Sequence, residues 1–119
     1  MLLQPRQCDW REIVSFKRIG IEEAKQLLLN SATAAPVKSV QIVDIRDDEA
    51  FGQGRIDNAV HLHNANLQEF VDNADLDAPL LVYCYHGHMS QSAAAYFAEQ
   101  GFAEAYSLDG GYEAWAIEK

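Results

Sequence analysis

The chain alternates short apolar runs with longer amphipathic segments. The short runs are rich in branched and aromatic side chains and are bounded by turn residues, which predicts strands. The first of them is expected to be a short edge strand. The strands are expected at Phe16–Ile19, Val40–Ile45, Ala59–Leu62, Leu80–Tyr83 and Ala105–Leu108.

Helices are predicted between these strands, where apolar residues recur every three or four positions. Residues 30–36 (NSATAAP) have the composition of a turn, and a second turn is expected at Gly52 and Gly54. Gly101 lies where it can end a helix. The helices are expected at Ile21–Leu29, at Asp48–Phe51, at Ser90–Gln100, and from Gly110–Gly111 through Trp115, and Leu67–Val71 is expected to form the middle of another helix.

Strands that alternate with helices predict an α/β fold with a central, mostly parallel sheet and helices on both faces. A length of 119 residues suits one domain. We expect a single domain over residues 16–119, preceded by an N-terminal extension over residues 1–15. Ligands of such sheets bind beyond the carboxyl ends of the strands.

The formal net charge of −9 argues against a nucleic acid or an anionic membrane as a partner. No apolar run is long enough to span a bilayer, and the N-terminus lacks the apolar core of a signal peptide. We therefore expect a cytoplasmic protein. In that reducing setting, a disulfide between Cys8 and Cys84 is not expected.

The candidate chemistry lies at the end of the most apolar strand, which delivers Cys84 to a loop containing Gly87. A helix of small residues follows, so its unpaired N–H groups and those of the loop can face one point and bind an anion. Such a place favours the thiolate over the thiol. A cysteine there can also be a small buried hydrophobe. Gly87 favours the anion site, because a tight concave loop needs positive φ or a close approach of a ligand.

Three segments together resemble the rhodanese family, most closely its short single-domain thiosulfate sulfurtransferases. Val43–Leu62 is similar to the family's strand with its Asp-x-Arg pattern, here Asp44 and Arg46. Cys84–Met89 is similar to its active-site loop. Tyr106–Trp115 is similar to its Leu-x-Gly-Gly-x-x-x-Trp signature. The resemblance implies a rhodanese-like fold.

Three positions depart from the family's pattern. Arg55 stands where the family usually has His, and Asn58 where it usually has Gly. Met89 replaces the hydroxyl or basic residue expected in the loop. These departures bear on substrate affinity and preference.

The resemblance also implies a mechanism. The Cys84 thiolate would take the outer sulfur of thiosulfate as a persulfide and pass it to cyanide, or in the cell to a small thiol or a thioredoxin-like protein. No external cofactor is implied. The N–H groups expected to hold the persulfide belong to Tyr85, His86, Gly87, His88 and Met89.

Several residues have a second interpretation. Cys84, His86 and His88 are too few and too closely spaced for a zinc site, so no metal is expected. The two loop histidines either carry positive charge near the anion or are merely solvated. His61 and His63, at a strand end, are expected to be structural.

The remaining candidates are expected to support the fold. For Asp44 and Arg46 a catalytic role is the alternative, but a stabilising pair at the end of a buried strand is favoured. Tyr112 and Trp115 are expected to be core anchors of the last helix.

Two other functions compete. A cysteine-based phosphatase or arsenate reductase would use the same strand, loop and helix, but it needs an Arg where this chain has Ser90. A catalytically idle rhodanese-like module that binds or regulates a partner is the alternative from a different class. The intact Cys84 argues against it.

Overall fold

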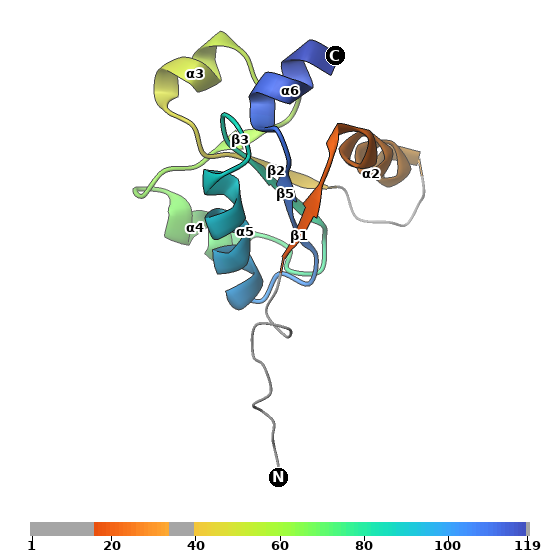
Figure 1. Cartoon of the computed structure of the whole chain (residues 1–119). Coiled ribbons are helices and arrows are strands. Elements are labelled where there is room, and N and C mark those ends of the chain that lie inside the picture. The colour runs from red at the N-terminus through yellow and green to blue at the C-terminus, as the bar shows by residue number, and fades with distance from the viewer. Residues whose placement is uncertain (1–15, 34–39, 119) are drawn as a thin grey trace.

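The sheet is parallel throughout the described strands, and helices cover both of its faces (Figure 1). The computed structural model describes residues 16–33 and 40–118. The strands are β1 (Lys17–Ile19), β2 (Gln41–Asp44), β3 (Val60–His61), β4 (Leu80–Tyr83) and β5 (Ala105–Leu108). The helices are α2 (Ile21–Thr33), α3 (Asp48–Gln53), α4 (Leu67–Asn73), α5 (Met89–Glu99) and α6 (Gly111–Glu118).

The strand order is β1-β5-β4-β2-β3, so β4 lies in the middle and β1 at an edge, as predicted. The four residues of β4 are all buried. In the register of the sheet Asp44 lies beside Tyr83, at the carboxyl ends of β2 and β4. The predicted fold class is therefore confirmed, and Cys84 leaves the sheet at the edge where ligands bind.

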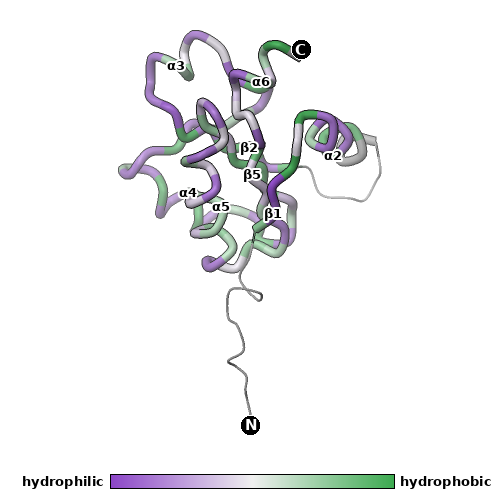
Figure 2. The backbone as a smooth tube through the Cα atoms, viewed as in Figure 1, coloured by the Kyte–Doolittle hydropathy of each residue, from purple (hydrophilic) through white to green (hydrophobic). Residues whose placement is uncertain are grey.

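Two apolar clusters hold the helices against the sheet. The cluster under α2 and α6 includes Ile42, Leu81, Tyr83 and Leu108, with Trp115 packed against it. Trp115 and Tyr112 are thus core anchors, as the sequence predicts. The other cluster, under α4 and α5, consists of Val43, Leu62, Leu80, Val82, Ala94, Phe97 and Phe102. In Figure 2 the hydrophobic colouring is concentrated in the central strands, and the helices alternate between hydrophobic and hydrophilic residues.

Helix ends account for most of the differences from the predicted elements. The turn predicted from residue 30 is wrong over residues 30–33, because α2 continues to Thr33; residues 34–36 lie outside the described residues. Extending a formed helix costs little, and no strong helix breaker occurs before Pro36. Similarly, α3 continues through Gly52, with the Gly54 N–H bonded to the Ala50 carbonyl.

The start of α4 also differs, since Leu67–Val71 begins the helix rather than forming its middle. The preceding Asn66 holds the loop instead of extending the helix. Its side chain accepts from the His63 N–H at 2.8 Å and donates to the His61 carbonyl at 3.0 Å. No helix in the described part of the chain has both the length and the apolar character needed to cross a membrane.

The conformation of Asn58 accounts for one departure from the family's pattern. Among the described residues, it alone combines a side chain with positive φ, at 71°. Glycine adopts this left-handed conformation freely, and asparagine tolerates it better than most residues. Asn58 thus meets the same backbone requirement as the usual glycine.

We expect Asn58→Gly to change the free energy of unfolding by about 0.5 kcal/mol or less, because the side chain is exposed. Asn58→Val should lower it by about 1–2 kcal/mol, since a branched side chain is strained at this φ. Urea unfolding measures both. The control is Asp57→Val, at an exposed neighbour; an equal loss there would contradict the backbone explanation.

Candidate active site

The Cys84 thiol lies directly beyond β4 and is 2% exposed. Its sulfur accepts two backbone hydrogen bonds, from the Gly87 N–H at 3.2 Å and the Ser90 N–H at 3.3 Å. The first donor belongs to the predicted loop. The second belongs to the first turn of α5, whose N–H groups have no partner within the helix. Loop and helix therefore meet at the sulfur.

Gly87 gives the loop its shape. Its φ is +95°, and a Cβ there would lie 2.8 Å from the Gly110 nitrogen and 3.0 Å from the Leu108 carbonyl oxygen. Both the backbone angle and the space therefore require glycine. The sequence-based argument for a positive φ at Gly87 is confirmed.

The start of α6 holds the outer side of the same loop. The Tyr112 N–H donates to the Cys84 carbonyl at 2.8 Å, and the Glu113 N–H to the Tyr85 carbonyl at 3.2 Å. A Cβ on Gly111 would lie only 2.5 Å from the Tyr85 carbonyl, so glycine permits this close approach. With its carbonyls bound to α6, the loop leaves N–H groups free to face the sulfur.

These donors change the acidity of the thiol. Burial alone raises the pKa of Cys84, but hydrogen bonds from the Ser90 side chain and from the backbone of Ser90, Gly87 and His86 outweigh it. The net pKa is lowered, since each donor stabilises the thiolate more than the thiol. The site therefore favours an activated nucleophile.

Ser90 is the functional residue that sequence reasoning missed as a partner of the thiol. It is fully buried, and its hydroxyl lies 2.8 Å from that of Ser107, which is buried on β5. Ser107 can donate to Ser90 while Ser90 directs its own proton to the sulfur. The position of Ser90, in the first helical turn after the cysteine loop, could have indicated a contact with the thiol. Nothing in the sequence indicates that Ser107 contacts Ser90.

Most of the loop's side chains point away from the sulfur. Tyr85, His86, His88 and Met89 are exposed. His86 Nδ1 lies 2.9 Å from Glu113 Oε1 on α6, at the surface. Tyr85 donates from its hydroxyl to the Asp47 carboxylate, whose other oxygen caps α3. The structure thus gathers the loop around Cys84 through backbone groups.

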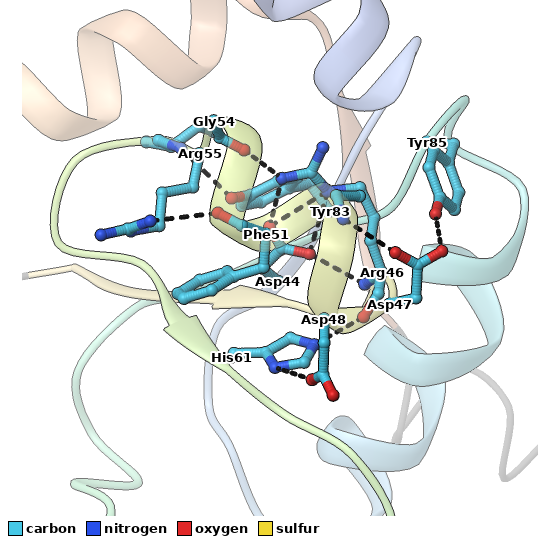
Figure 3. Close-up of polar contacts among 12 residues, drawn as sticks. Asp44, Arg46, Asp47, Asp48, Phe51, Gly54, Arg55, His61, Tyr83 and Tyr85 are labelled. Atoms are coloured by element: carbon cyan, nitrogen blue, oxygen red, sulfur yellow. Dashed lines mark hydrogen bonds and ion pairs between the residues drawn. The ribbon is translucent and has the colours of Figure 1, made fainter.

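Asp44 and Arg46 form a buried ion pair at the end of β2, as predicted. Arg46 Nε lies 3.1 Å from both carboxylate oxygens of Asp44, and its Nη2 lies 2.6 Å from one of them (Figure 3). The same Nη2 donates to the Gly54 carbonyl at 2.6 Å. The guanidinium carbon lies 4.3 Å from the centre of the Tyr112 ring. Arg46 therefore joins β2, the end of α3 and α6.

His61 has the structural role that the sequence predicts. Its Nε2 lies 2.6 Å from the Arg46 carbonyl oxygen, and its ring stacks on Phe51 at 4.8 Å between centres. His63 is exposed and lines a pocket beside Met89. Within residues 16–33 and 40–118, no group of three or more His, Cys, Asp or Glu side chains is placed to hold a metal ion.

Arg55 also has a local explanation, although the family usually has His at this position. Its guanidinium carbon lies 4.5 Å from the centre of the Phe51 ring, and it donates to the Phe51 carbonyl at 3.0 Å. Arg55 thus packs on α3.

Comparison with known proteins identifies the pattern of residues 9–118 as a rhodanese-like domain. The thiosulfate sulfurtransferase GlpE of Ectopseudomonas mendocina is 53% identical over 100 residues, which cover 84% of this chain and 84% of that protein. GlpE of Shewanella oneidensis is 50% identical over 101 residues, which cover 85% of this chain and 93% of that protein.

Solved structures agree on the fold. A rhodanese-like domain protein of Staphylococcus aureus superposes with a TM-score of 0.67 at 27% identity, covering 84% of this chain and 91% of that one. A Rhodopseudomonas palustris protein described as a possible tyrosine phosphatase gives 0.70 at 22% identity, covering 99% and 96%. At that identity, the second likeness shows the fold alone.

Replacing Ser90 with alanine is expected to move the reactivity of Cys84 to higher pH, because one donor to the thiolate is lost. The measurement is the rate of alkylation by iodoacetamide against pH, in a Cys8→Ser background. The wild-type midpoint should lie below that of an ordinary thiol. Ser92→Ala, on the exposed side of α5, should leave it in place; an unmoved midpoint in Ser90→Ala contradicts this role.

Proposed function

Because this chain belongs to the rhodanese family and catalyses sulfur transfer from thiosulfate, we propose that it carries the sulfur as a persulfide on Cys84. The observation that supports this is the sulfur atom of Cys84, which accepts hydrogen bonds from two inward-facing N–H groups. Such donors stabilise a thiolate before the reaction and an anionic persulfide after it. The same backbone cradle therefore serves both states.

The first step is a displacement at sulfur. The Cys84 thiolate attacks the outer sulfur of thiosulfate, a new S–S bond forms, and the bond within thiosulfate breaks. Sulfite leaves with the electron pair of that bond, and the persulfide keeps one negative charge. The step balances without a metal, a redox cofactor or a proton donor, so we propose that no external cofactor takes part.

The second step passes the outer sulfur to an acceptor. Cyanide would leave as thiocyanate, and a thiolate would leave as a persulfide of its own, with Cys84 returned to the thiolate in both cases. We propose a thiol as the cellular acceptor. A reducing compartment such as the cytoplasm suits this chemistry, because an activated free thiol oxidises readily elsewhere.

The phosphatase alternative lacks the charge that it needs. Phosphate-transferring cysteine loops grip the oxyanion with a bidentate guanidinium, and this position is the buried Ser90. The nearby Arg46 is already engaged by Asp44 and the Gly54 carbonyl. The site therefore suits a sulfur atom better than a phosphoryl group.

Thiosulfate should add one sulfur atom to the chain at Cys84, and cyanide should remove it with release of thiocyanate. Intact mass spectrometry before and after each addition measures both steps. Cys84→Ser should form no thiocyanate above background, whereas Cys8→Ser should keep its activity. Wild-type turnover by Cys84→Ser would show that the assignment is wrong.

The backbone of the loop should matter more than its histidines. We expect Gly87→Val to remove nearly all activity, because its Cβ would collide with the backbone of Gly110 and Leu108. Alanine at His86 or His88 should lower kcat/KM by about tenfold or less, through weaker binding of thiosulfate. Steady-state kinetics, with circular dichroism to verify folding, compares the three variants. Full activity in Gly87→Val, with none in His86→Ala, would assign catalysis to the side chain instead.

A further inference from the structure

An apolar pocket of about 360 Å³ lies beside the cysteine loop, and the proposed transfer from thiosulfate to cyanide does not use it. Its walls come from the residue after β2, the segment after β3, the start of α4 and one side of α5. They include Ile45, Leu62, Leu67, Met89, Ala93 and Phe97.

The register of the sheet places this pocket next to Cys84. Asp44 pairs with Tyr83, so Ile45 and Cys84 follow side by side, each directly beyond the end of its strand. The preceding residues Val43 and Val82 both belong to the cluster under α4 and α5. Ile45 packs against that same cluster, and the Cys84 sulfur accepts from the Ser90 N–H of α5, so both side chains lie on that side of the sheet.

Met89 links the pocket to the loop. It is 63% exposed, immediately precedes Ser90, whose N–H binds the Cys84 sulfur, and also lines the pocket. Met89 stands where the family's loop usually has a hydroxyl or basic residue. The side chain therefore adds apolar surface between the pocket and the cysteine loop.

The lining does not suit thiosulfate or cyanide as an occupant. It contains no Asp, Glu, Lys or Arg, and its polar side chains are His63, Asn64, Ser92 and Tyr96. Thiosulfate is a dianion, and cyanide has no apolar body to bury. A volume near 360 Å³ is at the small end for ligand pockets, which fits an uncharged aliphatic or aromatic group.

We propose that this pocket is the acceptor subsite of the enzyme and binds the apolar body of a small thiol, with its sulfur directed at Cys84. The proposal rests on the persulfide mechanism. The acceptor's thiolate attacks the outer sulfur of the persulfide, and the bond from that sulfur to Cys84 breaks. Cys84 leaves as a thiolate, and the acceptor becomes a persulfide anion. Its thiol proton has gone to solvent beforehand.

The test follows discharge of the loaded protein. Cys8→Ser protein is treated with thiosulfate, freed of excess reagent and mixed with cyanide, 2-mercaptoethanol or 2-phenylethanethiol. Quenched intact mass spectrometry measures the loss of the sulfur, with rates compared per thiolate. We expect the rate of discharge by 2-phenylethanethiol to saturate with its concentration. This thiol should also react at least about tenfold more efficiently than 2-mercaptoethanol, because 2-mercaptoethanol has no apolar body to bury in the pocket.

Matched variants locate the effect. Ala93→Phe fills the pocket, and Ala116→Phe makes the same change on an exposed part of α6. We expect Ala93→Phe to abolish the preference for 2-phenylethanethiol and Ala116→Phe to retain it, with cyanide discharge unchanged in both. If Ala93→Phe does not fold, Leu67→Gln repeats the test without adding bulk to the pocket. Its control is Leu76→Gln, outside the pocket.

The outcomes separate this inference from the proposed function. If thiosulfate does not load Cys84, or cyanide does not discharge it, the persulfide mechanism fails. With both steps intact, equal efficiency of the two thiols overturns the subsite alone. The subsite is also overturned if the preference for 2-phenylethanethiol survives in both Ala93→Phe and Leu67→Gln. It is overturned as well if folded variants lose cyanide discharge in parallel, or if only a thioredoxin-like protein discharges the persulfide.

Discussion

The ion pair of Asp44 and Arg46 is the interaction on which the rest of the site depends. Both side chains are buried, and Arg46 uses its planar donors on the carboxylate and on the Gly54 carbonyl. A buried charge that loses its partner costs about 3–5 kcal/mol, so neither residue can be removed alone without a large penalty. Asp44 ends β2, which places the pair beside Tyr83 in the sheet.

The contacts of this pair lead to the reactive sulfur in two steps. The Tyr112 ring lies over the Arg46 guanidinium, which holds the start of α6 at the carboxyl edge of the sheet. The Tyr112 N–H in turn holds the Cys84 carbonyl. Burial and a hydrogen bond with Asp44 also raise the pKa of Tyr83, so this phenol remains neutral under the loop. Structural and catalytic parts of the site are therefore continuous.

The sequence predicts well those parts of the site whose conformation is determined by residues adjacent in the chain. Leu80–Tyr83 is a short, wholly apolar run, and its bounds as a strand agree with the structure. Gly87 signals a tight loop because the conformational requirement acts on that residue alone. By contrast, the contact of Ser90 with Ser107, or of Tyr85 with Asp47, depends on how separate elements meet. No spacing along the chain encodes these contacts.

The resemblance to a family predicts positions but not their physical reasons. The two glycines before α6 belong to the recognised signature, yet only the structure shows that Gly111 lies against the backbone of the cysteine loop. Asn58 looks like a departure in sequence and meets the same backbone requirement in space. Predictions for residues 1–15, the N-terminal extension with Cys8, fall outside the described residues.

The hydrogen bonds between the start of α6 and the cysteine loop join residues that lie far apart in the chain. Cys84 precedes Tyr112 and Glu113 in the chain, and the N–H groups of these two later residues hold the loop's carbonyls. Ser107, the partner of Ser90, also comes later. In a chain whose last strand and helix have not yet folded onto the sheet, the nucleophile therefore lacks these partners. The full set of donors is held in place only when β5 and α6 have folded onto the loop, so the activation of this thiol depends on completion of the fold.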